Sequence, residues 1–199
     1  MTTSLPAGLR ERKKAKTRAA IRDHAMRLFE EQGYASTTVE QIAEAAEVSP
    51  STFFRYFPTK EDVILTDDFD PLIVAAIKTE PQSVTPARAL LNAMRSVFLG
   101  LSPEEWERER RRQRIFRTVP ELQARSMNQT VTAVDMLAAT LAERDGRPAD
   151  ELVYRVIAGA LVGVVLAIAP PGRPDSVYDR GEFARIEEAL LLLERNFRL

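Results

Sequence analysis

The sequence predicts an all-α protein of about nine helices, with a small three-helix head followed by a larger helical body. Apolar residues recur at intervals of three and four along most of the chain, and no stretch alternates steadily between apolar and polar residues. No Asn-Gly or Asp-Gly pair lies between β-branched runs, as it would in a β-hairpin. The 199 residues suffice for a small domain joined to a larger one, and we define residues 1–66 as the head and 67–199 as the body.

The composition excludes several kinds of site. The chain has no cysteine, which rules out disulfides, zinc–thiolate sites and cysteine nucleophiles. Residues 1–8 have no apolar segment typical of a secretory signal, and the longest apolar run, 156–169, is too short to span a bilayer. We therefore expect a cytoplasmic protein with no membrane partner.

The first expected helix has an apolar stripe and a basic beginning. Gly33 ends it as a C-terminal cap would, and its stripe consists of Ile21, Ala25, Leu28 and Phe29. Seven cations lie between Leu9 and Arg22: Arg10, Arg12, Lys13, Lys14, Lys16, Arg18 and Arg22. Such a run is either a solvated face or a phosphate-binding surface, and its position directly before the rest of the head favours DNA.

Two short helices joined by a tight turn come next. Thr38 and Gln41 form a capping-box pattern at the start of the second helix, and Ser49 caps the third, with Pro50 in its first turn. Val48 is placed to fill the angle between the two helices. This is the layout of a helix-turn-helix, whose second helix lies in the major groove while the first braces the DNA backbone.

The third helix begins with short side chains, which allow close approach to base edges and phosphates. Arg55 is the candidate for a base or phosphate contact, and Tyr56 and Lys60 offer a hydroxyl and a cation to phosphate oxygens. From these residues alone, the expected DNA contacts are Thr37, Thr38, Ser49, Pro50, Ser51, Thr52, Arg55, Tyr56 and Lys60.

The remaining elements are all expected to be helices. A fourth helix is predicted from Lys60 toward Glu80, with a kink or break at Pro71. Proline- and glycine-rich loops separate the later helices, which are expected at 87–101, 103–118, 120–144, 150–169 and 178–197.

The head resembles the TetR family of bacterial transcriptional regulators. The residues that carry the resemblance are the run 37–49 (TTVEQIAEAAEVS), the run 52–57 (TFFRYF) followed by Lys60-Glu61, and the preceding Phe29-x-x-x-Gly33-Tyr34. The resemblance covers residues 9–66. It implies an all-helical homodimer whose two heads bind a palindromic double-stranded operator. It also implies a body that binds a small hydrophobic or amphipathic effector, which releases a repressor from DNA.

Two positions differ from the family pattern. Glu47 stands where the family usually has glycine, and a positive φ there costs a non-glycine residue on the order of 1 kcal/mol. Phe54 stands where the family usually has a tyrosine that contacts phosphate or a thymine methyl group. Phe54 can make only the apolar contact, and we add it to the expected DNA-contacting residues. The hydroxyl of Tyr56 is expected to compensate for the one that Phe54 lacks.

The end of the chain predicts a dimer interface. A narrow apolar seam on the last helix consists of Phe183, Ile186, Leu190, Leu193 and Phe197, and the preceding helix contains the closely packing pair Gly159 and Gly163. In the resembled family the last two helices form a four-helix bundle with the partner subunit. An internal core would show a similar pattern.

The middle helices are expected to enclose the effector. Adaptable apolar side chains that suit such a pocket are Met94, Phe98, Phe116, Met127, Val131 and Val134, although core packing gives each of them a simpler explanation. Arg110, Arg114 and Arg117 form a stripe in the run 108–117 that suits an anion. The alternative is a solvated face with pairs such as Glu107–Arg111.

A second resemblance bears on the effector. The segments 117–125 and 137–144, together with 52–57, resemble an actinobacterial subgroup that includes the mycofactocin-locus regulators. The subgroup implies acyl-CoA-like ligands.

Two other classes of protein compete with a regulator. An enzyme is disfavoured because the only histidine, His24, has no nucleophile motif near it, and no phosphate loop is visible. Asp67, Asp68 and Asp70 lack the fixed loop geometry of a metal site. We expect no catalytic residue, no metal and no cofactor. The second rival is a helical binding protein that has lost DNA recognition through Glu47 and Phe54.

Overall fold

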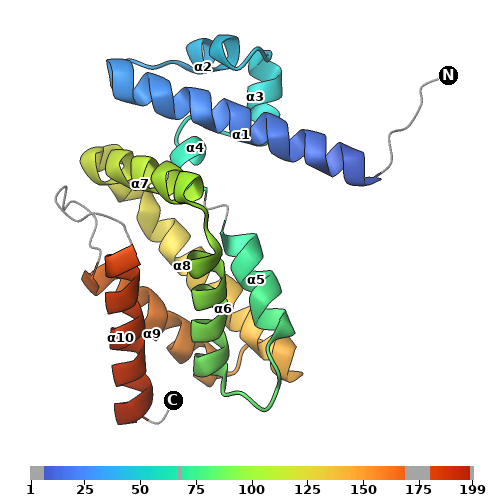
Figure 1. The fold of residues 1–199 in the computed structure, drawn as a ribbon, viewed down its shortest axis with the longest axis vertical. Coiled ribbons are helices and arrows are strands. Elements are labelled where there is room, and N and C mark those ends of the chain that lie inside the picture. The colour runs from blue at the N-terminus through green and yellow to red at the C-terminus, as the bar shows by residue number, and fades with distance from the viewer. Residues whose placement is uncertain (1–6, 67–68, 169–179, 198–199) are drawn as a thin grey trace. The chain divides into compact units, whose positions relative to one another are not determined.

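The computed structural model describes residues 7–66, 69–168 and 180–197, and every element within those ranges is a helix (Figure 1). The all-α prediction is therefore confirmed. The helices are α1 (Ala7–Gln32), α2 (Val39–Ala45), α3 (Pro50–Tyr56), α4 (Asp62–Leu65), α5 (Asp70–Thr79), α6 (Pro86–Gly100), α7 (Pro103–Thr118), α8 (Pro120–Asp145), α9 (Leu152–Ile168) and α10 (Arg180–Phe197). By internal contacts the chain divides into two compact units, Met1–Thr66 and Asp67–Leu199.

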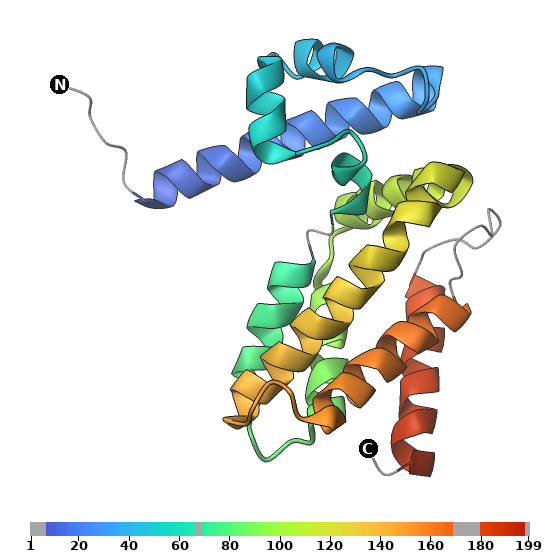
Figure 2. The same cartoon turned by 180° about the vertical axis from the view of Figure 1, so that it is seen from behind.

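The head is built on the long helix α1, against which α2 and α4 pack, while α3 packs against α2 (Figures 1 and 2). The predicted stripe of α1 is largely buried, with Ile21, Ala25 and Phe29 all below 5% exposure. Phe53 from α3 and Phe57 after it complete this small core, and their rings lie 5.9 Å apart. The core fixes the angle between α2 and α3.

The helix boundaries of the head follow the predicted capping signals. The hydroxyl of Thr38 accepts from the Gln41 amide at 3.3 Å, and the Gln41 side chain accepts from the Thr38 amide at 2.9 Å. Ser49 accepts from the Thr52 amide at 3.1 Å, with Pro50 in the first turn. Gly33, with φ of 85°, follows the end of α1. These caps satisfy amides that a short helix leaves without partners.

The helix expected from Lys60 toward Glu80, with a kink or break at Pro71, is broken into two helices, α4 and α5. The Asp62 carboxylate accepts from the amide and the hydroxyl of Thr59, both at 2.9 Å, so α4 begins after Lys60. The chain leaves α4 at Thr66 in an extended conformation. Pro71 lies in the first turn of α5, where proline is tolerated, so it starts a helix instead of kinking one.

The core of the body consists of side chains from α5, α6, α7, α8, α9 and α10. Phe98 lies at its aromatic centre, with ring centroids 5.5 Å from Phe69, 6.2 Å from Trp106 and 5.1 Å from Phe183. Helix α8 lies against α9 and α5, and α10 lies against α6 and α9 (Figure 2). None of the helices in the described ranges combines the length and apolar character needed to cross a membrane.

A buried polar network joins the end of α8 to the start of α9 and to the loop before α6. The Arg144 guanidinium donates to the Asp145 carboxylate at 2.6 Å and to the Val84 carbonyl at 2.9 Å. The Tyr154 hydroxyl donates to the same carboxylate at 3.0 Å. Burial, together with the neighbouring carboxylate of Asp145, raises the pKa of Tyr154. The network fixes three segments that are distant in sequence.

Candidate DNA-binding surface, dimer face and effector pocket

The turn between α2 and α3 contains the one described non-glycine residue with a positive φ. That residue is Glu47, with φ of 53°. The amides of Glu47 and Val48 donate to carbonyls of α2, to Glu44 at 3.0 Å and to Ala43 at 2.9 Å. The left-handed conformation considered for this position is thus present, and a residue with a Cβ occupies a site that glycine fits with less strain.

The start of α3 presents short polar side chains on its exposed face. Ser49, Pro50 and Ser51 are exposed, and Thr52 is half-buried. The Ser49 hydroxyl lies 2.9 Å from that of Ser51 and 3.0 Å from that of Thr52. The hydroxyls therefore form a linked group at the surface, as expected for a helix that approaches DNA closely.

The middle of α3 exposes one aromatic and one cationic side chain. Phe54 is 49% exposed, and its ring stands edge-on to the buried Phe53 at 5.5 Å and 90°. Arg55 is exposed, and its guanidinium carbon lies 5.5 Å from the centre of the Tyr56 ring. The structure brings Phe54 and Arg55 together on one exposed helix, beside the half-buried Tyr56.

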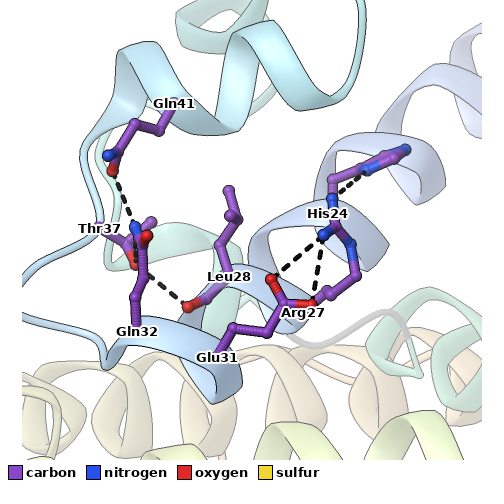
Figure 3. Close-up of polar contacts among 7 residues, drawn as sticks. All are labelled: His24, Arg27, Leu28, Glu31, Gln32, Thr37 and Gln41. Carbon is purple, nitrogen blue, oxygen red and sulfur yellow. Dashed lines mark hydrogen bonds and ion pairs between the residues drawn. The ribbon is translucent and has the colours of Figure 1, made fainter.

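The side chain of Thr37 is not on this surface, which corrects the expectation that it contacts DNA. Thr37 is 1% exposed, and its hydroxyl donates to the Gly33 carbonyl at 2.9 Å. Gln32 donates to the same hydroxyl at 3.1 Å and to the Gln41 side chain at 2.9 Å (Figure 3). Thr37 therefore positions the start of α2 against the end of α1, whereas the neighbouring Thr38 is exposed.

Lys60 has a structural role that the sequence did not predict. Its ammonium donates to the carbonyls of Tyr34 and Thr37, each at 2.9 Å, and lies 4.2 Å from the centre of the Tyr34 ring. These contacts hold the loop between α1 and α2. The phosphate contact expected of Lys60 is revised accordingly, because its charge already has partners within the head.

Two cations of the basic run are also structural. Arg18 donates to the Tyr56 carbonyl at 3.2 Å, and its guanidinium carbon lies 4.6 Å from the centre of the Phe57 ring. Arg22 donates to the carbonyls of Val63 at 3.1 Å and Thr66 at 3.0 Å. Desolvation lowers the pKa of Arg18. The acceptors are about forty residues away in sequence, so spacing along the chain gave no signal of these contacts.

His24 lies on α1 in a surface arrangement (Figure 3). Its Nδ1 is 3.5 Å from the Arg27 guanidinium, which pairs with Glu31 at 3.2 Å. Within the described residues, no three His, Asp or Glu side chains are grouped so that they could hold a metal ion. Asp67 and Asp68 lie outside the described residues.

The seam expected on α10 is partly turned inward. Phe183 and Ile186 are buried in the core of their own chain, at 3% and 2% exposure, so they are corrected from dimer contacts to core residues. Leu190 is half-buried against the same core. The side chains of Leu193 and Phe197 lie outside the described residues.

The exposed apolar surface is instead mainly on α9. Its large exposed side chains are Leu152, Val153, Val156 and Leu166, and Leu192 is exposed on α10. Gly159 and Gly163 continue the stripe of Leu152 and Val156 at helical spacing. A Cβ built on either glycine would meet no atom within 4 Å. The two glycines could be predicted from the sequence, whereas the large exposed side chains beside them could not, because the apolar run gives no sign of which face lies outward.

The candidate pocket residues do not form one set. Met94 and Phe98 are buried in the core of the body, Val134 is packed at its edge, and Phe116 is half-buried. Val131 is exposed, which corrects its placement among enclosed residues. The side chain of Met127 lies outside the described residues.

The arginine stripe of α7 is divided between surface and interior. Arg110 and Arg114 are exposed, while Arg117 is buried. Glu107 pairs with Arg110 at 3.2 Å. A second pair, Glu109 with Arg112, is buried and bidentate at 2.8 and 2.6 Å, and sequence analysis did not predict it. A solvated face therefore describes only part of this run.

The head contains a helix-turn-helix, and the larger helical body has an exposed apolar face. These two features are typical of one class of protein, the DNA-binding transcriptional regulators. The family model described as bacterial regulatory proteins, tetR family, matches residues 21–66, and the model described as MftR C-terminal domain matches residues 84–170. The regulator TcmR of Streptomyces glaucescens is 37% identical over 151 residues, which cover 72% of this chain and 67% of that protein. The chain belongs to the TetR family of bacterial transcriptional regulators.

Other relatives agree with this assignment. MftR of Mycobacterium tuberculosis, a regulator named for mycofactocin biosynthesis, is 29% identical over 159 residues, or 78% of this chain and 79% of that protein. SmeT, a repressor of a multidrug efflux pump of Stenotrophomonas maltophilia, shares the fold with a TM-score of 0.54 and 22% identity, over 88% of this chain and 89% of that one. MftR is named as a regulator of transcription, the class that the sequence led us to expect, and SmeT shows the same fold.

Proposed function

We propose that the chain acts as a homodimeric repressor that binds a palindromic operator through α3 and is released by a small hydrophobic or amphipathic effector. The observation that carries the proposal is the exposed face of α3, where Phe54 and Arg55 project from a capped helix within a helix-turn-helix. Dimeric heads of this type reach successive major grooves when they lie about 34 Å apart, or a multiple of that distance.

Within this proposal, the exposed side chains of α3 divide into two roles. Arg55 donates to a guanine edge or a phosphate, and Phe54 contacts an apolar group such as a thymine methyl. The hydroxyls of Thr38, Ser49, Ser51 and Tyr56 donate to phosphate oxygens, which fix the position of the helix. Pro50 and Thr52 permit the close approach.

The test is selection of duplexes from a random-sequence pool by the unaltered protein. The proposal predicts recovery of a two-fold symmetric sequence. Arg55→Gln weakens binding to that sequence, because each good base contact contributes about 1–3 kcal/mol. Arg147→Gln, an exposed arginine of the body paired with Glu151, is the matched control. Recovery of no enriched sequence would instead support the rival, a binding protein that has lost DNA recognition.

The proposed dimer forms through the exposed stripe of α9, with Leu192 of α10. Glycine within a helix costs about 1 kcal/mol relative to alanine, and neither Gly159 nor Gly163 is required by contacts within its own chain. Close approach of a helix from the partner subunit would explain why glycine occupies both positions. Val156→Glu is expected to shift the sedimenting species from dimer to monomer, whereas Leu99→Glu, at an exposed leucine of α6, leaves the dimer intact. A dimer in both variants would contradict this interface.

The proposed effector is an acyl-CoA, a fatty acid or a similar amphipathic molecule bound by the body. Support comes from the match of residues 84–170 to the MftR C-terminal domain family and from the apolar side chains around Phe98. An effector that releases DNA must bind the DNA-incompetent state more tightly than the bound state. Thermal-shift titration with acyl-CoAs, fatty acids and unrelated hydrophobic compounds tests the proposed chemical class of the effector. Absence of a selective shift by any acyl-CoA or fatty acid would contradict it.

A further inference from the structure

Helix α9 carries a single charge although much of its surface is exposed. Among its 17 residues, Arg155 is the only charged one. The large exposed side chains around it, such as Leu152 and Val156, are apolar. A helix face that stays in water normally carries polar and charged side chains, and a contiguous exposed apolar surface marks an interaction site. The one charge on this face therefore bears on what covers it.

The charge of Arg155 is neutralised by the neighbouring helix α8. Its guanidinium is paired with the Asp135 carboxylate at 2.5 Å, and the two side chains are 50% and 53% exposed. An ion pair that is open to water contributes little to the stability of a single chain. Folding of one chain therefore gives little reason for a charged pair within an apolar face.

Exposed apolar surface lies on both sides of the pair. Val131, one turn before Asp135 on the same face of α8, is exposed. Leu152 and Gly159 lie one turn before and one turn after Arg155 on α9. The pair thus joins the stripe of α9 to an apolar position on α8. We define the α8–α9 surface by what these residues share, their place on the two adjoining outer faces: 131, 135, 152, 155, 156, 159 and 163.

The charge balance of the α8–α9 surface favours a second copy of the chain as its partner. Its one cation and one anion are already paired, so two copies meet without net repulsion. A nucleic acid or an anionic membrane would instead favour an excess of lysine and arginine. The open space beside Gly159 and Gly163 admits a helix, and a two-fold dimer presents the same surface from both subunits.

We propose that a second copy of the chain covers the Arg155–Asp135 pair and Val131, so that the dimer interface extends from α9 onto α8. This rests on the dimer proposed above and adds a specificity-determining pair to it. Under the partner subunit the pair is removed from water, where either charge alone is strongly unfavourable. A surface that brings a further charge against the pair is thereby disfavoured as a partner.

The test is a double-mutant cycle on the dimer dissociation constant, measured by sedimentation of the labelled full-length protein over a dilution series. Arg155→Met leaves Asp135 without its partner, and Asp135→Leu does the same to Arg155. Each single variant is expected to raise the dissociation constant at least about thirtyfold, because it leaves one covered charge unpaired. The double variant is expected to return to within about threefold of the unaltered protein, because apolar side chains can replace a covered pair. Its recovery also shows that the single variants do not fail through misfolding.

The control is Lys78→Met, which breaks an exposed pair between α5 and α8 and is expected to keep the dissociation constant. Unchanged constants for both single variants, together with dissociation by Val156→Glu, overturn the extension onto α8 alone. A double variant as weak as the single ones also overturns the role of the pair. A dimer that neither Val156→Glu nor the single variants weaken overturns both this proposal and the proposed α9 interface, as does an unaltered protein that forms no dimer.

Discussion

Replacing Lys60 with methionine is expected to destabilise the start of α2. The change keeps the length of the side chain and its packing on Tyr34, but it removes both bonds from the ammonium to the carbonyls of Tyr34 and Thr37. A hydrogen bond from a charged donor contributes about 1.5–3 kcal/mol, and an exposed cation–π contact about 0.5–1 kcal/mol. The summed contributions of the two bonds and the ring contact are about 3.5–7 kcal/mol. Since the freed carbonyls regain water at this half-buried position, the expected loss is smaller than that sum, about 2–3 kcal/mol.

Hydrogen exchange of the α2 amides measures this loss in the head. The expected decrease in protection is about 30- to 150-fold, at 1.4 kcal/mol per factor of ten. Trp106, the one tryptophan of the chain, lies in the body, so its fluorescence serves as an internal reference. Lys78→Met is the matched control, since its surface pair with Glu143 contributes at most about 1 kcal/mol. Unchanged protection of α2, together with a shallower salt slope for DNA binding, would show that Lys60 serves phosphate instead.

Three further predictions concern single side chains. Glu47→Gly removes the strain of a left-handed backbone conformation at a non-glycine residue. It is expected to raise the free energy of unfolding of the head by about 0.5–1 kcal/mol, measured by denaturant unfolding. A lower free energy of unfolding would refute the claim that Glu47 is strained. Arg22→Leu removes both hydrogen bonds to carbonyls at the end of α4. The hydrogen-exchange protection of the α4 amides is expected to fall by at least about 1.5 kcal/mol, while the α2 amides keep their protection. An equal loss of protection in α2 and α4 would contradict a local role for Arg22. The raised pKa of Tyr154 means that the folded body binds this proton more tightly than the unfolded chain. Its contribution to stability is therefore present below about pH 10 and is lost as pH rises through the folded pKa. Tyr154→Phe should flatten the decline of unfolding free energy above about pH 10, followed by Trp106 fluorescence, and parallel pH curves would exclude the linkage.

The local features of the head could be predicted from sequence because their signals lie within a few residues of one another. Capping at Thr38 and Ser49 depends on residues three positions apart. The left-handed turn at Glu47 could be anticipated because the family usually has glycine there. Of the kink and the break predicted at Pro71, the structure has the break, and it precedes the proline because proline fits the first turn of a helix.

Roles that depend on contacts across the fold could not be predicted. The sequence favours a surface position for the cations of Lys60 and Arg22, yet each binds backbone carbonyls 23 to 44 residues away. Sequence also could not show which side of α10 faces its own chain. Phe183 and Ile186 have the spacing of an interface seam, and that spacing is the same for a core stripe. The burial of both side chains and the packing of Phe183 on Phe98 distinguish the two.

The central claim is that the exposed face of α3 recognises specific double-stranded DNA. The most direct measurement is a salt titration of binding to the selected duplex beside a scrambled duplex of equal length. The account predicts that affinity for the selected duplex exceeds that for the scrambled one by at least about a thousandfold, and that both fall linearly with log salt. Equal affinity for the two duplexes, or binding that does not change with salt, would contradict it.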